Sequence, residues 1–181
     1  VQPEHDVTAA LIPGEQEASA VIIARESAVL CGTAWAAQVL QQIDSKAKLV
    51  WLAAEGDWLE PNREFARVTG KARSLLSAER SMLNFLQTLS ATATETRRLA
   101  ALIAHTNCRL LDTRKTLPGL RRAQKHAVRV GGGQNHRMGL FDAFLIKENH
   151  IRACDGIAAA VQAARTSEPG KPIEVEVRNL D

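Results

Sequence analysis

The spacing of apolar residues in the first part of the chain is that of short strands around one helix. Residues 18–33, ASAVIIARESAVLCGT, hold β-branched runs that a charged triplet interrupts, which predicts strands. An Ala-, Gln- and Leu-rich stretch predicts a helix over 33–43, and further strands are predicted over 48–52 and 64–69. This order of elements predicts an α+β sandwich.

From residue 71 the pattern becomes helical. Leu75, Met82 and Leu89 recur at intervals of seven, so they share one arc of a helix predicted over 71–90. Helical geometry puts Glu79 near the middle of that arc, where an unpaired carboxylate is costly. We therefore expect Glu79 to have an ion-pair partner.

A second helix is predicted over 94–105, with Thr92 or Thr94 as its N-cap. Strand and helix patterns alternate beyond it, which predicts parallel β/α units with an active site at the C-terminal ends of the strands. The predicted strands are 109–113, 141–147 and 173–177, and the predicted helices are 120–130 and 155–164.

The change of pattern near residues 90–94 predicts two domains within an α/β fold. Residues 1–92 are expected to form the sandwich, and residues 93–181 the first half of an α/β barrel. Three parallel strands cannot close a barrel, so we expect this barrel to be incomplete.

Composition excludes several classes of protein. Hydrophobic residues make up 45% of the 181 positions, and no run reaches the roughly 20 apolar residues that span a bilayer. The first residues, VQPEHDVTAALIP, lack the pattern of a secretory signal. The three cysteines, Cys31, Cys108 and Cys154, are odd in number and widely spaced, which favours reduced thiols and a cytoplasmic location.

Positive charge gathers in residues 109–137. This segment holds eight Lys or Arg and one acid, Asp112, and so carries +7, whereas the whole chain carries +3. Such a density of cations around the triple glycine 131–133 is typical of a site for a multiply charged anion. The glycines match neither a dinucleotide fingerprint nor a P-loop, and a flexible connector stays an alternative.

Part of this charge has a simpler interpretation. The side chains on the predicted helix 120–130 are expected to form a solvated surface; they are Arg121, Arg122, Lys125 and Arg129. The histidines at 105, 126 and 150 do not have metal-ligand spacing, so no metal cluster is expected from them.

Three motifs in this region, DTRKTLPGL, GGGQNHRMGL and LIKENH, resemble in order and spacing the signature of the quinolinate phosphoribosyltransferase family. HDVTAALIP, EGDWL, LLSAERSMLNFLQTLS and PIEVEVRNLD match as well, so the resemblance covers nearly the whole chain. The family usually has Gly-Ile where this chain has Ala91-Thr92.

The resemblance implies phosphoribosyl transfer from phosphoribosyl pyrophosphate to quinolinate with loss of CO₂, a step of NAD biosynthesis. It implies Mg²⁺ as cofactor and a homodimer in which Arg80 reaches the neighbouring site. It assigns substrate binding to Arg80, Thr113, Arg114, Lys115, His136, Arg137, Lys147 and Glu176, with Lys115, Lys147 and Glu176 also catalytic. Glu174 shares a strand face with Glu176 and is the less favoured carboxylate.

The family has a helical region before HDVTA and further β/α units after VRNLD. We therefore expect this chain to be an incomplete copy and, alone, inactive. One alternative is a related phosphoribosyltransferase with another acceptor. A more distant one is a nucleic-acid-binding module using the basic helix 120–130, but aromatic content of 4% leaves little to stack on bases.

Overall fold

The computed structural model describes residues 6–179; the outermost residues used above for the signal and family arguments lie outside this range. The chain forms two compact units. Unit 1 consists of Val1–Asp112 with Thr116–Asn135, and unit 2 of Thr113–Lys115 with His136–Asp181. The sequence-based division between residues 92 and 93 stays a prediction.

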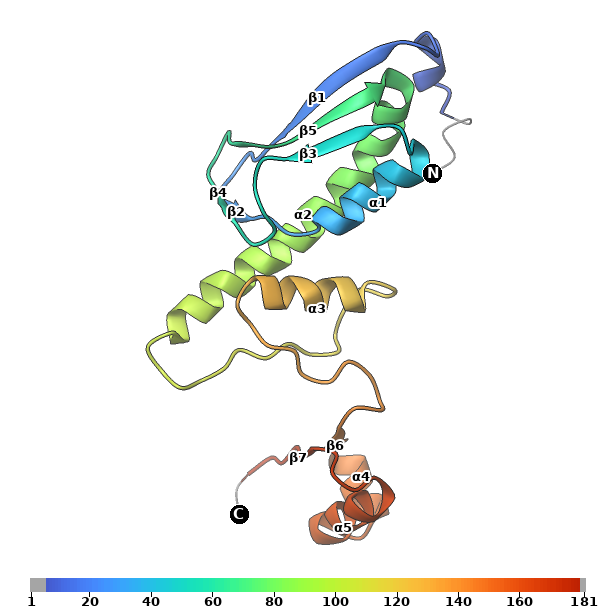
Figure 1. Ribbon diagram of the computed structural model, residues 1–181. Helices are drawn as coiled ribbons and strands as arrows, with labels where there is room; N and C mark the ends of the chain where they lie inside the picture. The colour runs from blue at the N-terminus through green and yellow to red at the C-terminus, as the bar shows by residue number, and fades with distance from the viewer. Residues whose placement is uncertain (1–5, 180–181) are drawn as a thin grey trace. The chain divides into compact units, whose positions relative to one another are not determined.

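Unit 1 contains a three-stranded antiparallel sheet and a separate strand pair. The sheet has the order β1-β5-β3, and β2 pairs with β4. The elements are η2 (Ala9–Leu11), β1 (Glu17–Ile23), β2 (Ala28–Val29), α1 (Thr33–Ile43), β3 (Lys48–Trp51), β4 (Trp58–Leu59), β5 (Glu64–Lys71), α2 (Ala72–Ile103) and α3 (Arg121–Val130). Figure 1 shows α1 and α2 on one side of this sheet. The predicted α+β sandwich is confirmed.

The main core of unit 1 lies between the sheet and these two helices. It contains Leu40 of α1, Val68 of β5, and Met82 and Leu86 of α2, all at most 5% exposed. Burying each side chain of this size contributes about 1.5–3 kcal/mol of transfer free energy. The apolar positions of the strands and helices therefore fix how the sheet sits on the helices.

The predicted break between two helices is wrong, because α2 is one helix of 32 residues. Hydroxyls in the polar run donate hydrogen bonds to the carbonyl four residues back: Thr92 to Thr88 (3.1 Å), Thr94 to Ser90 (2.6 Å) and Thr96 to Thr92 (2.8 Å). Thr94 Oγ1 also accepts the Val29 N–H at 2.8 Å, and Ser90 Oγ accepts the Cys31 N–H at 2.9 Å. Ser and Thr residues, which usually cap helices, thus lie in the interior of α2 and accept hydrogen bonds from the backbone at and just after β2.

Glu79 has no place in the core, contrary to the sequence-based expectation. It is exposed, and so is its neighbour Leu76, which is 46% exposed. The buried stripe of α2 instead runs through Ala78, Met82 and Leu86 at intervals of four. Met82 and Leu86 belong to the predicted arc, so the arc is largely confirmed and only its edge at Leu76 and Glu79 faces solvent.

Helix α3 agrees with the prediction and packs on α2 through small side chains. Ala93 of α2 meets Ala123 and Ala127 of α3 in a second buried cluster. The helix ends in a Schellman arrangement: the Gly133 N–H donates to Val128 O at 2.9 Å, and the intervening Gly132 has a positive φ of 95°.

The triple glycine is required by close packing. A Cβ at Gly131 would lie 2.4 Å from the carbonyl oxygen of Ala93, and one at Gly133 would lie 2.9 Å from Thr96 Cγ2. These distances leave no space for a side chain. The glycines therefore join α3 to α2, and neither the flexible-connector reading nor a phosphate loop is needed to explain them.

Unit 2 has a two-stranded parallel sheet, β6 (Phe144–Ile146) with β7 (Ile173–Val175). Helices α4 (Glu148–Ala153) and α5 (Ile157–Ser167) connect the strands. Ile146 packs against Ala160 and Ala164 of α5 in a small core. This is the predicted β/α pattern, although α4 was not expected.

The predicted strand 109–113 is not formed. The structure has only a single parallel bridge there, between Leu111 and Gln134, because no longer partner strand lies beside it. Within residues 6–179 no barrel closes, as expected, and the α/β class is confirmed. Among the helices of this range, none combines the length and hydrophobicity that crossing a bilayer requires.

The carboxylate of Glu55 joins α1 and α3 within unit 1. Its oxygens accept hydrogen bonds from the Gly32 N–H (3.0 Å) and from both the N–H (3.0 Å) and the hydroxyl (2.5 Å) of Thr33. His126 Nε2 of α3 lies 3.0 Å from Glu55 Oε1. Burial alone would raise the pKa of Glu55, but these hydrogen bonds outweigh it and lower the pKa to about 2.

We predict that Glu55→Gln lowers the free energy of unfolding by about 1–3 kcal/mol at neutral pH, because a charged acceptor is lost. The folded-state pKa lies below the unfolded value of 4.5, so this contribution is present above pH 4.5 and disappears as the pH falls toward 2. Urea unfolding at several pH values measures it. Glu15→Gln, whose side chain is 90% exposed, is the control and should change stability little. An equal loss at pH 7 and pH 3 would contradict the hydrogen-bond assignment.

Candidate active site

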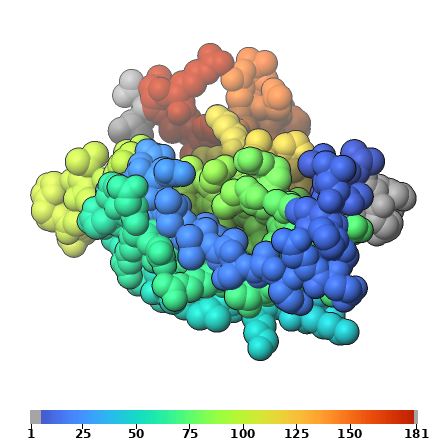
Figure 2. Space-filling model, turned by 90° about the horizontal axis from the view of Figure 1, so that it is seen from above, coloured from blue at the N-terminus to red at the C-terminus, as the bar shows by residue number. Residues whose placement is uncertain are grey.

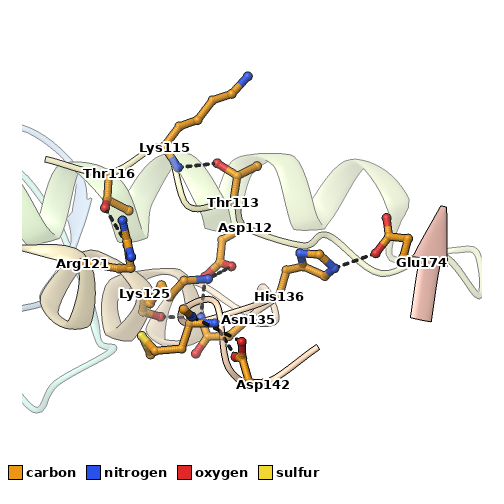
Figure 3. Close-up of polar contacts among 12 residues, drawn as sticks. Asp112, Thr113, Lys115, Thr116, Arg121, Lys125, Asn135, His136, Asp142 and Glu174 are labelled. Atoms are coloured by element: carbon orange, nitrogen blue, oxygen red, sulfur yellow. Dashed lines mark hydrogen bonds and ion pairs between the residues drawn. The ribbon is translucent and has the colours of Figure 1, made fainter. Parts of the chain in front are cut away.

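Unit 2 collects the predicted substrate-binding cations from three separate segments. The first is Thr113–Lys115. Thr113 Oγ1 accepts the backbone N–H of Lys115 at 3.1 Å, which forms a tight turn. Arg114 is half-buried, whereas Lys115 is exposed and its side chain extends away from this turn (Figure 3). The turn therefore carries one half-buried and one exposed cation.

The second segment is the loop that starts at His136. His136 Nε2 lies 2.7 Å from Glu174 Oε2 on β7 (Figure 3). Arg137 is half-buried, and its Nε is shielded from solvent without a hydrogen-bond partner in the described part of the chain. The Arg137 guanidinium therefore has a donor that no described residue satisfies.

Asp142 shapes this loop, and the sequence argument did not single it out. Its carboxylate accepts the N–H groups of Met138 at 2.5 Å and Gly139 at 3.3 Å. The bond from Met138 is the main cause that lowers the pKa of Asp142, and the charge of Arg137 adds to it. The glycine at 139 followed three residues later by an Asp was the available signal for such a turn.

The third segment is the end of β6. Lys147 directly follows this strand and precedes α4, and its backbone N–H donates to His150 Nδ1 at 3.0 Å. Its ammonium lies 3.2 Å from Glu176 Oε2, which follows β7. In β/α proteins, functional side chains usually lie at the C-terminal ends of the parallel strands.

Glu174 within β7 and Glu176 after it each contact a predicted site residue. Glu174 contacts His136, and Glu176 contacts Lys147. The four side chains are 27–60% exposed, so each pair contributes little to stability. The sequence favoured Glu176 over Glu174, but the geometry gives the two similar positions.

One cation of the +7 segment differs from its expected role. Lys125 was expected on a solvated face of α3, but it is 1% exposed and its ammonium contacts the Asp112 carboxylate (Figure 3). Arg122 and Arg129 are exposed, as expected. The segment is therefore not one continuous basic surface, and the nucleic-acid interpretation loses one of its cations.

Arg80 lies on α2 in unit 1. It is exposed, and the described residues offer its side chain neither a hydrogen bond nor an ion pair. One groove of unit 1, about 430 Å³, lies between the segment 22–30 and α2, in the hollow visible in Figure 2. This groove contains none of the predicted substrate-binding residues.

The described residues do not form an oxygen-rich site of the kind that Mg²⁺ prefers. In residues 6–179 the one cluster of three potential metal-binding side chains is Cys31, Glu55 and His126. Burial raises the pKa of the Cys31 thiol, and the Glu55 charge raises it further, so the sulfur stays protonated. The oxygens of Glu55 already accept hydrogen bonds, as described above. This cluster fits a hydrogen-bonded link better than a metal site.

Comparison with known proteins identifies the family. The model of the quinolinate phosphoribosyl transferase N-terminal domain matches residues 6–90, and that of the C-terminal domain matches residues 92–181. The chain belongs to the quinolinate phosphoribosyltransferase family. The resemblance carried by the DTRKTLPGL, GGGQNHRMGL and LIKENH motifs is thereby confirmed.

Curated members of the family extend beyond this chain. A nicotinate-nucleotide pyrophosphorylase [carboxylating] of Oryza sativa subsp. japonica is 42% identical over 94% of this chain and 47% of its own length. A probable one of Bacillus subtilis (strain 168) is 40% identical over 95% of this chain and 59% of its own. The chain spans about half the length of such relatives.

A solved family member has the same fold. The nicotinate-nucleotide pyrophosphorylase from Francisella tularensis superposes with a TM-score of 0.94 at 49% identity, over 97% of this chain and 62% of that chain.

We predict that Arg114→Lys and Arg137→Lys in the full-length protein each lower kcat/KM at least about tenfold, or ~1.4 kcal/mol. Lysine keeps the charge but loses the planar fork that holds a carboxylate with two hydrogen bonds. Steady-state kinetics with varied quinolinate measures the loss. Arg129→Lys, an exposed position on α3, is the matched control and should change nothing. Normal kinetics in both site variants would remove the carboxylate assignment.

Proposed function

We propose that the protein transfers the phosphoribosyl group of phosphoribosyl pyrophosphate to quinolinate. The products are nicotinate mononucleotide, CO₂ and pyrophosphate, in the synthesis of NAD. One observation carries the proposal: unit 2 gathers the predicted cations from three segments, two that follow the parallel bridge between Leu111 and Gln134 and one that follows β6. Both substrates are multiply anionic, and names such as that of quinolinate phosphoribosyltransferase [decarboxylating] 1b of Nicotiana tabacum support the choice.

The two arginines are suited to the dicarboxylate. Arg114 and Arg137 are both half-buried, which keeps their forks ordered and strengthens their attraction for carboxylates. Lys147 adds a compact charge from the end of β6. Together these groups would fix the pyridine ring, with its nitrogen toward the ribose carbon.

The remaining groups are assigned to the phosphoribosyl side. Lys115 and His136 would stabilise the negative charge that grows on the pyrophosphate as it departs. The pyridine nitrogen forms a bond to the ribose carbon, and the carbon–oxygen bond to pyrophosphate breaks with its electron pair on oxygen. Glu176 would then stabilise the positive charge that develops on the ribose.

Loss of CO₂ follows from the new bond. The ring nitrogen is now quaternary and positive, so it stabilises the electron pair that the departing carboxylate leaves on the adjacent ring carbon. A proton from water completes nicotinate mononucleotide. The cations that hold the other carboxylate keep the ring in place during this step.

The exposed contacts of Glu174 and Glu176 are suited to a site that waits for an anion. Each glutamate orders one site side chain, His136 or Lys147, and an arriving carboxylate or phosphate can replace the glutamate at small cost. Substrate binding would thereby release a carboxylate for the ribose.

Mg²⁺ stays a proposal that rests on the family resemblance. The described residues form no cluster of oxygen ligands for Mg²⁺, whereas phosphoribosyl pyrophosphate carries phosphate oxygens. The ion would therefore bind together with this substrate. We infer a reducing compartment such as the cytoplasm, because Cys31, Cys108 and Cys154 are all free thiols. The names of the plant relatives place those proteins in chloroplasts or mitochondria.

We expect the full-length protein to form nicotinate mononucleotide from quinolinate, and to release CO₂, in the presence of phosphoribosyl pyrophosphate and Mg²⁺. Nicotinate in place of quinolinate should give no more than about a hundredth of the rate. It has only one carboxylate, so one of the two arginines would be left without its partner. Chromatography of the product, with and without a chelator, measures both points. A higher rate with nicotinate would favour a related enzyme with another acceptor.

We propose further that Arg80 serves the site of the partner in a homodimer, since it is exposed on α2 without a partner side chain among the described residues. Arg80→Ala and Lys115→Ala should each be inactive alone. Equal mixing with free subunit exchange should restore about one quarter of wild-type activity, because half the dimers are mixed and each has one intact site.

The control mixes Arg114→Ala with Lys115→Ala. Both residues belong to unit 2, so each site keeps one lesion and no activity should return. Absence of recovery in the Arg80 mixture, with exchange verified independently, would rule out the trans assignment.

A further inference from the structure

The chain leaves unit 1 at two positions that directly precede the site. Asp112 is the last unit 1 residue before Thr113, and Asn135 is the last before His136. Every predicted site cation between residues 113 and 137 follows one of these two exits. The geometry of the exits therefore sets where the two groups of cations begin.

Side-chain contacts hold the two exits together. Asn135 Nδ2 donates to Asp112 Oδ2 at 2.6 Å and to the backbone carbonyl of Lys125 at 2.8 Å. The Lys125 ammonium contacts the other carboxylate oxygen of Asp112 (Figure 3). Lys125 belongs to α3, so both exits are attached to the same helix.

Backbone hydrogen bonds complete the arrangement. The Asp112 N–H donates to Gln134 O at 3.1 Å, and the Gln134 N–H donates to Leu110 O at 2.8 Å. These bonds form the parallel bridge between Leu111 and Gln134. Neighbouring strands in such a pair lie about 4.8 Å apart, and each site segment starts two residues, at most about 7 Å of chain, beyond the bridge.

The Lys125 and Asp112 side chains are almost completely shielded from solvent, and Asn135 is half-buried. The side chain of Lys125 is 1% exposed and that of Asp112 is 7% exposed. Burying an ion pair seldom adds stability over an apolar pair of the same shape, and in some proteins such a pair fixes a unique geometry instead. An apolar residue at position 125 alone would leave the Asp112 carboxylate buried without its partner, whereas apolar residues at both positions would avoid that cost, so the presence of the pair calls for another explanation.

We propose that Lys125, Asp112 and Asn135 are positioning residues for the reaction. They hold the two exits side by side, so that Arg114 and Arg137 reach the same dicarboxylate. This inference rests on the proposed function. It also assigns a role to Lys125 and Asn135, which neither touch substrate in the proposed mechanism nor belong to the predicted site.

The experiment compares Lys125→Met and Asn135→Ala in the full-length protein. Each should lower kcat/KM for quinolinate about tenfold or more, and quinolinate affinity in calorimetry should fall by a similar factor. The double variant should lose little more than the worse single one, because the residues act as one unit. Arg129→Met removes an exposed charge from the same helix and should change neither quantity.

Two further measurements separate positioning from general instability. Leu40→Ala weakens the main core of unit 1 and should lower the melting temperature without changing kcat/KM of the folded protein. Hydrogen exchange at the Asp112 and Gln134 amides should accelerate in Lys125→Met and Asn135→Ala but not in Leu40→Ala.

Faster exchange with kcat/KM within about twofold of wild type would overturn the proposal. So would a loss of activity that only follows the unfolded fraction, as in Leu40→Ala. If the wild-type protein itself forms no product, the proposed function fails. The positioning role is then decided by pyrophosphate affinity, which must fall in Asn135→Ala and stay unchanged in Arg129→Met.

Discussion

The two cores of unit 1 are joined because helix α2 continues without a break through a run of Ser and Thr residues. Its first part belongs to the core beneath the sheet, and its later part, through Leu89 and Ala93, belongs to the core shared with α3. The hydroxyls of Ser90 and Thr94 satisfy backbone groups near β2 while the helix keeps its own hydrogen bonds. A break at this point would separate the two cores, and α3 would lose its packing surface.

The position of α3 in turn determines where the exits lie. Its small residues approach α2 closely, and Gly131 and Gly133 have no space for a Cβ. Arg97 of α2 donates to the carbonyls of Val130 and Gly131 at 3.2 and 3.3 Å, which closes the C-terminal end of α3. Steric fit and hydrogen bonding therefore place Lys125 where Asp112 can meet it.

The charges of the chain divide into buried and exposed groups with different consequences. The Lys125–Asp112 pair is dry, so removing one partner would leave an isolated buried charge at high cost. The ion pairs of Glu174 and Glu176 are exposed to solvent, so another anion can replace either glutamate at small cost. The first kind is suited to fixing geometry, and the second to giving way to an anionic substrate.

The sequence by itself determined the strands and helices whose periodicity follows their burial, such as α1, β5 and α3. It also determined the family, because the motifs around Arg114, His136 and Lys147 stand close along the chain. Tertiary structure decided the rest. The continuity of α2, the exposure of Glu79 and the burial of Lys125 depend on partners that lie distant in sequence, namely β2, the sheet and Asp112. The physical reason is that periodicity indicates which face of an element is apolar. Whether a polar group can be buried depends instead on a hydrogen-bonding or charged partner, which only the tertiary structure supplies.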